Sequence, residues 1–65
     1  MQQITKEEFE TVLKAAEVEN AERVEMGLSK MEVITKDYEG SLIEYYLGGM
    51  LFGFIQDGIY YSNGI

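Results

Sequence analysis

Residues 41–62, SLIEYYLGGMLFGFIQDGIYYS, decide the fold of this chain. The stretch is strongly apolar, since its only charged residues are Glu44 and Asp57. Two dipeptides that favour two-residue hairpin loops, Gly48-Gly49 and Asp57-Gly58, divide it into three parts. Because aromatic and β-branched residues favour strands, the stretch predicts an antiparallel β-meander. Its predicted strands are about 41–47, 50–56 and 59–62.

The two loops also predict which residues pair across the strands. The first loop pairs Tyr45 with Phe52, and the second pairs Ile55 with Tyr60. Because side chains alternate between the faces of a strand, each face of the predicted sheet is apolar. One face is expected to hold Ile43, Tyr45, Leu47, Met50, Phe52, Phe54 and Tyr61. The other is expected to hold Leu42, Glu44, Tyr46, Leu51, Gly53, Ile55 and Tyr60.

The same stretch has a second interpretation. Ser41 and Glu44 also fit a capping box, so residues 42–55 would instead form a buried helix in a mostly α-helical chain. Three internal glycines count against this helix, because each costs it about 1 kcal/mol relative to alanine. The strand interpretation is favoured on that ground.

The segment before this stretch begins with the signature of a helix N-terminus. Thr5 and Glu8 have the spacing of a capping box, and Ile4 and Phe9 have that of the hydrophobic staple around it. The pattern predicts a helix over about 6–26. At 3.6 residues per turn, its expected buried stripe is Phe9, Val12, Leu13, Ala16, Asn20 and Val24.

The region that follows has alternatives. Gly27 is a natural terminator of the helix, but a break near Asn20 as a new cap and an alternating strand over 24–28 are the competing interpretations. Residues 31–35 predict a strand. Residues 37–40, with Asp first and Gly last, predict a type I turn.

Together these elements predict an α+β fold, with an N-terminal amphipathic helix packed on a small antiparallel β-meander of about four strands. Residues 1–65 are expected to form a single domain. A chain of this length buries only about 60% of its unfolded surface, and small domains are usually supported by disulfides, a metal or oligomerisation. The chain contains no Cys and no His, so oligomerisation or a bound partner is the support that remains.

The predicted sheet leads to a predicted interface. One helix covers one face of a small sheet, and an uncovered apolar face of this size marks an interaction site. We therefore expect a homo-oligomer, most simply a dimer, that buries the second face. The expected oligomer or partner interface is Leu42, Tyr46, Leu51, Ile55 and Tyr60.

The charge of the chain indicates the kind of partner. Its net charge is −7, which repels nucleic-acid phosphates and anionic membranes and suits a partner with a basic surface. A simpler alternative is that the charge only maintains solubility. The expected acidic partner-binding face of the helix is Glu7, Glu10, Glu17, Glu19, Glu22 and Glu25. Neighbouring carboxylates on a helix lie about 5–6 Å apart, so this array is a possible nucleic-acid mimic.

The residues needed for chemistry are missing from the sequence. Without His or Cys, the usual general base and thiol nucleophile are absent, and the carboxylate pairs lie on a solvated helix face. We therefore expect no enzymatic activity, no cofactor and no metal site. The N-terminal residues lack the apolar run of a signal peptide, and the longest apolar run is too short to span a bilayer. A cytoplasmic location is expected.

These observations predict a small acidic protein-binding module that inhibits or modulates another protein, with a protein that carries a basic nucleic-acid-binding surface as one candidate partner. The alternative is a self-assembling structural subunit whose apolar sheet face forms a homo-oligomer.

Overall fold

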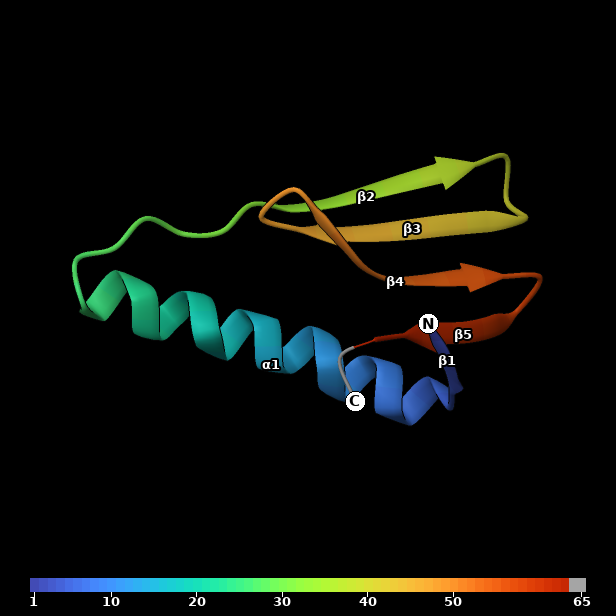
Figure 1. The fold of residues 1–65 in the computed structure, drawn as a ribbon, viewed down its shortest axis with the longest axis horizontal. Helices are drawn as coiled ribbons and strands as arrows, with labels where there is room; N and C mark the ends of the chain where they lie inside the picture. The colour runs from blue at the N-terminus through green and yellow to red at the C-terminus, as the bar shows by residue number, and fades with distance from the viewer. Residues whose placement is uncertain (64–65) are drawn as a thin grey trace.

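The computed structural model describes residues 1–63 and has the predicted α+β architecture. One helix, α1 (Lys6–Glu25), lies on one side of a five-stranded antiparallel sheet (Figure 1). The strands are β1 (Gln2–Ile4), β2 (Val33–Tyr38), β3 (Leu42–Leu47), β4 (Met50–Gln56) and β5 (Ile59–Ser62). Their order across the sheet is β1-β5-β4-β3-β2. The alternative in which residues 42–55 form a helix is wrong, because this segment forms β3 and β4.

The helix begins where the capping box predicts. Thr5 Oγ1 accepts a hydrogen bond from the Glu8 backbone N–H at 3.1 Å, and Glu8 Oε1 accepts one from the Thr5 N–H at 2.9 Å. Ile4 and Phe9 are both buried, as the staple requires. The helix runs without a break to Glu25, so the break at Asn20 and the strand over 24–28 are not present.

The centre of the core is Phe9, which is 2% exposed. Its ring centroid lies 5.1 Å from that of Tyr45 and 5.4 Å from that of Tyr60. The ring rests directly over Gly53, where an added Cβ would lie 2.8 Å from Phe9 Cε1 and 2.9 Å from the Tyr61 carbonyl oxygen. Only glycine fits under the helix at this position.

A β-bulge in β4 accompanies this close contact. The pairs nearest the first loop are as expected, but Tyr45 pairs with Gly53 rather than with Phe52. The predicted Tyr45–Phe52 pair is therefore wrong, because Phe52 is the extra residue of the bulge. The Phe52 carbonyl oxygen accepts a hydrogen bond from Ser62 Oγ at 2.8 Å. Bulges let a strand turn its later side chains to the other face.

The hairpin at the second loop has the predicted register. Gln56 pairs with Ile59, and Ile55 pairs with Tyr60. Asp57 and Gly58 have φ values of +51° and +79°, the left-handed conformation that a type I′ hairpin turn requires at both positions.

Strand β2 begins later than predicted because the helix holds the residues before it. Asn20 Nδ2 donates to the Met31 carbonyl oxygen at 2.9 Å, and Asn20 Oδ1 accepts from the Met31 N–H at 2.8 Å. The Asn20 side chain thus bonds both the N–H and the carbonyl oxygen of Met31, which therefore do not pair in the sheet. The predicted strand over 31–35 is shifted to Val33–Tyr38, and the turn moves beyond Tyr38 with it.

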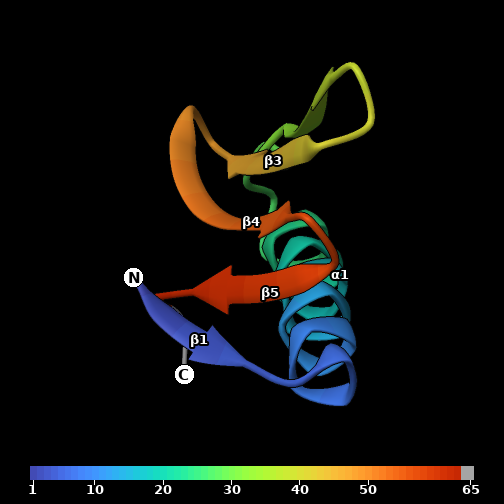
Figure 2. The same ribbon diagram turned by 90° about the vertical axis from the view of Figure 1, so that its right-hand side faces the viewer.

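The helix covers only part of the sheet. Figure 2 shows α1 on one side of the strands, close to β5, while β2 and β3 extend past it. Among residues 1–63, the buried apolar residues are Ile4, Phe9 and Ala16. Val24, at the end of the predicted stripe, is 51% exposed. The radius of gyration is 12.4 Å, against about 11 Å for a compact chain of this length. The core is therefore small and concentrated at the N-terminal half of α1.

Candidate interaction surfaces

The register divides the sheet into two faces. Tyr45 and Tyr60 touch Phe9 and so lie on the covered face, toward α1. Residues that alternate with them, together with their cross-strand partners, lie on the opposite side, which we call the open face. The open face consists of Gln3, Ile34, Lys36, Tyr38, Leu42, Glu44, Tyr46, Leu51, Phe54, Gln56, Ile59 and Tyr61.

The open face is mostly apolar and aromatic. Phe54 and Tyr61 stack with their ring centroids 4.7 Å apart and 21° between the ring planes. Toward the rim, Ile34, Tyr38 and Ile59 are 37%, 48% and 41% exposed. Within residues 1–63, no helix or strand packs over this side of the sheet (Figure 2). An uncovered surface of this composition, spread over four strands, has the character of a contact surface.

Four residues of the open face, Lys36, Tyr38, Glu44 and Tyr46, form a polar site on β2 and β3 that we call the Glu44 cluster. The Tyr46 hydroxyl donates to Glu44 Oε1 at 2.9 Å. Lys36 is the cross-strand partner of Glu44, and its Nζ lies 4.8 Å from the centroid of the Tyr46 ring, within the range of a cation–π contact. A carboxylate, two phenols and a cation therefore meet at one point of an otherwise apolar surface.

The carboxylate of this cluster controls how the two phenols ionise. Hydrogen bonding to Glu44 is the largest cause that raises the pKa of both Tyr38 and Tyr46 above the ordinary value of a tyrosine. Desolvation of the hydroxyls and repulsion by the Glu44 charge raise the pKa of each further. Both hydroxyls therefore remain protonated, and able to donate hydrogen bonds, throughout the neutral pH range.

The residues of the expected interface do not all share one face. Leu42, Tyr46 and Leu51 lie on the open face, as the predicted set requires. Ile55 and Tyr60 lie on the covered face with Phe9, because the bulge at Phe52 shifts the second half of β4 relative to β3. The expected placement of these two residues on the second face is therefore wrong. The same shift brings Phe54 and Tyr61 to the open side, and the isolated Gly53 within a strand is the sequence signal for such a bulge.

The expected acidic face is solvated but is not a narrow stripe. Its residues, Glu7, Glu10, Glu17, Glu19, Glu22 and Glu25, are all exposed. At 100° per residue they are distributed around more than half of the helix circumference. Arg23, which the i,i+4 spacing places beside Glu19, donates from Nε to the Ser29 carbonyl oxygen at 2.8 Å. The outward side of α1 is thus broadly acidic.

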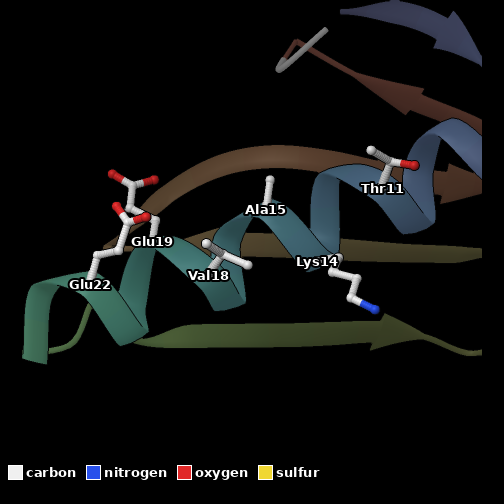
Figure 3. A pocket seen from close by; sticks show the side chains of 6 residues that line it. All are labelled: Thr11, Lys14, Ala15, Val18, Glu19 and Glu22. Atoms are coloured by element: carbon white, nitrogen blue, oxygen red, sulfur yellow. The ribbon is translucent and has the colours of Figure 1, made fainter.

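A shallow hollow runs along the outward side of α1 (Figure 3). It is lined by Thr11, Lys14, Ala15, Val18, Glu19 and Glu22. Figure 3 shows the Glu19 and Glu22 carboxylates on one side of it and the Lys14 ammonium pointing another way. Since every lining residue comes from one helix, this hollow is an open surface groove without walls that enclose a ligand.

Neither a metal centre nor a membrane-spanning helix is found in the part of the chain that the structure describes. No three acidic side chains of residues 1–63 approach one another as metal ligands do. Across the same residues, α1 lacks the apolar length needed to span a bilayer.

Comparison with known proteins gives no relative. Neither a protein-family model, nor a curated protein, nor a solved structure matches this chain at a significant level. The proposed function therefore rests on the open face and on the outward side of α1.

Proposed function

We propose that this chain is a non-enzymatic protein-binding module that inhibits or modulates another protein through its open face. The observation that carries the proposal is the aromatic and apolar surface of that face, which no element of residues 1–63 covers. Tyrosine and phenylalanine are enriched where proteins meet, and contiguous exposed apolar patches mark interaction sites. The apolar residues of the contact surface are Ile34, Tyr38, Leu42, Tyr46, Leu51, Phe54, Ile59 and Tyr61.

The partner in this proposal has a basic surface. The net charge of −7 and the acidic outward side of α1 attract such a protein over long range. Charges of this kind mainly raise the association rate, whereas buried aromatic contacts set the dissociation rate. A basic nucleic-acid-binding protein fits this requirement, and its groove would be blocked by the bound module.

The test begins with a pull-down from the native cells and identification of the captured protein by mass spectrometry. Binding of that protein is then measured with Tyr61→Asp, which places a charge on the open face beside Phe54. As a matched control, Val18→Asp places the same charge on the outward side of α1, where Val18 is 52% exposed. We expect about a ten-fold or greater loss of affinity for Tyr61→Asp, the size of an interface hot spot, and little change for the control. Equal losses for both variants would overturn the proposal.

The contribution of charge is tested separately. Replacing Glu17, Glu19 and Glu22 by Lys should slow association and weaken its salt dependence, since exposed charges are screened beyond about 8 Å at physiological ionic strength. The dissociation rate should change little. If dissociation accelerates as much as association slows, the acidic side of α1 is itself the contact surface.

The second candidate function is self-assembly, with a homodimer that buries the open face of each copy. It is supported by the small core and by the radius of gyration of 12.4 Å, because a chain with so few buried side chains gains stability from association. Sedimentation at micromolar concentration distinguishes the candidates. A dimer that persists in high salt and dissociates on Tyr61→Asp favours self-assembly, whereas a monomer under all conditions excludes it.

A further inference from the structure

The Glu44 cluster lies on β2 and β3, toward one edge of the sheet, and holds the two charged residues of the open face. Lys36 on β2 pairs with Glu44 on β3, and Glu44 in turn pairs with Phe54 on β4. Tyr46 and Leu51 lie beside them as the next cross-strand pair. The Tyr46 hydroxyl already donates to the Glu44 carboxylate, but an ionised carboxylate has lone pairs for further donors. It is costly to cover with an apolar surface unless a cation or another donor reaches it. Any partner that covers this face must therefore satisfy Glu44.

The cluster already attracts a cation from within the chain. Lys36 holds its ammonium 4.8 Å from the centre of the Tyr46 ring, while the hydroxyl of the same ring donates to Glu44 at 2.9 Å. The ring face and the carboxylate thus present two adjacent sites of negative potential. Both point away from α1, toward the side from which a partner approaches.

We propose that the Glu44 cluster binds an arginine side chain of a protein partner, with Lys36 as its built-in competitor. A guanidinium group is flat, so it can stack on the Tyr46 ring and donate in parallel to the Glu44 carboxylate. A lysine ammonium makes one of these contacts well but not both, because it is a compact point charge. This inference rests on the proposed function and names the group on the partner that the open face recognises.

Charge complementarity favours this occupant over a second copy of the chain. The chain contains one arginine, Arg23, which lies at the end of α1 and donates to the Ser29 carbonyl oxygen. In a symmetric dimer of open faces, each Glu44 would approach another acidic chain with a net charge of −7. A basic partner satisfies the carboxylate without that repulsion.

The test uses the full chain and a short synthetic peptide, acetyl-Val-Arg-Val-amide, titrated while the tyrosine ring resonances are followed by NMR. The companion peptides replace Arg by Lys or by Gln. We expect the Arg peptide to shift the Tyr46 and Tyr38 rings and to bind more tightly than the Lys peptide. The Gln peptide should leave both rings unchanged. Equal binding of all three peptides would overturn the inference.

Three variants make the result specific to the cluster. Glu44→Gln should weaken binding about five-fold, the scale of a partly exposed charged contact. Glu32→Gln is the matched control, because it removes the same charge from an exposed residue outside the cluster and outside the acidic face of α1, and it should have no effect. Lys36→Met removes the competitor and should strengthen binding about two-fold or more, a gain that loss of folding cannot produce.

Two outcomes would contradict the arginine site. If Glu32→Gln weakens binding of the Arg peptide as much as Glu44→Gln does, binding follows net charge and the cluster is a cross-strand pair only. If Lys36→Met does not strengthen binding, Lys36 is not a competitor and the inference fails. Neither result affects the proposed function, which fails instead if Tyr61→Asp retains full affinity for the captured partner.

Discussion

The two faces of the sheet contain similar side chains but have different roles. The covered face places Tyr45 and Tyr60 against Phe9 of α1, with ring centroids 5.1 and 5.4 Å away. The open face holds Phe54 and Tyr61 in a stack of its own, with no helix above it in residues 1–63. Aromatic content therefore does not identify the core of this protein. The core is identified by Gly53, because the helix approaches the sheet where this residue has no side chain.

The comparison implies that stability depends mainly on the covered face and recognition on the open one. Phe9 and the residues it touches are the best packed part of the chain, whereas the rim of the open face is more than a third exposed. Substitutions on the two faces should therefore separate folding from binding.

The largest difference is expected between two phenylalanines. Phe9→Ala should cost about 3–5 kcal/mol, the usual range for a fully buried ring, which is enough to unfold most of a domain this small. Phe54→Ala should cost only about 0.5–1.5 kcal/mol, because it loses one stacked contact on a half-exposed face. Urea unfolding followed by circular dichroism measures both. Similar losses for the two variants would contradict the assignment of the core to the covered face.

A smaller effect is expected where the helix touches the sheet. Gly53→Ala places a Cβ 2.8 Å from Phe9 Cε1, so we expect a loss of about 1–3 kcal/mol, as in an overpacked core. In a Phe9→Leu background the smaller side chain should give way, and the same substitution should cost less. A double-mutant cycle measures this coupling. Strictly additive losses would show that the strain lies at the Tyr61 carbonyl alone.

The parts of the fold that the sequence predicts correctly depend on local chemistry. Thr5 and Glu8 form their capping box within one turn, and Asp57-Gly58 sets the register of its own hairpin. Each of these features needs only residues close in the chain. For that reason the α+β class, the helix start and the β4–β5 pairing follow from short patterns.

The parts that the sequence misses depend on contacts between distant residues. The bulge at Phe52 coincides with Phe9 pressing on Gly53, more than 40 positions away in the chain. Strand β1 is three residues long and exists because it pairs with β5. The late start of β2 follows from Asn20 binding Met31. Each is a tertiary interaction that local propensity does not encode.

The same reason explains the partial prediction of the contact surface. Leu42, Tyr46 and Leu51 precede the bulge or lie near the first loop, so simple alternation places them on the correct side. Ile55 and Tyr60 lie beyond it, where a shift of one residue exchanges the faces. The Glu44 cluster was not predicted, because it requires the β2–β3 register that pairs Lys36 with Glu44.

Loss of the Asn20 side chain should affect the link between α1 and the segment that precedes β2. Asn20→Ala removes two hydrogen bonds to the Met31 backbone, each worth about 0.5–1.5 kcal/mol, and releases the segment that leads into β2. Asn20→Asp keeps the acceptor for the Met31 N–H and loses only the donor. Hydrogen exchange of the Met31 amide should therefore accelerate strongly in the alanine variant and less in the aspartate variant. Equal exchange rates in both would mean that this contact does not anchor β2.

The smallest effect, and one confined to the open face, is expected at alkaline pH. Because hydrogen bonding to Glu44 raises the pKa of Tyr38 and Tyr46 in the folded chain, these groups hold their protons more tightly folded than unfolded. Their contribution to stability is therefore fully present below the ordinary tyrosine pKa of about 10 and is lost as the pH rises through the raised values.

Ultraviolet absorbance of tyrosinate follows this ionisation directly. Glu44→Gln should move the last part of the titration to lower pH, because it removes the negative charge that both hydroxyls face. Glu32→Gln removes an equal charge from an exposed residue outside the cluster and should leave the curve in place. An unchanged curve for Glu44→Gln would mean that the cluster does not hold its geometry in solution. In that case Glu44 would be left as an unpaired charge on the open face, and the arginine site would lose its structural basis.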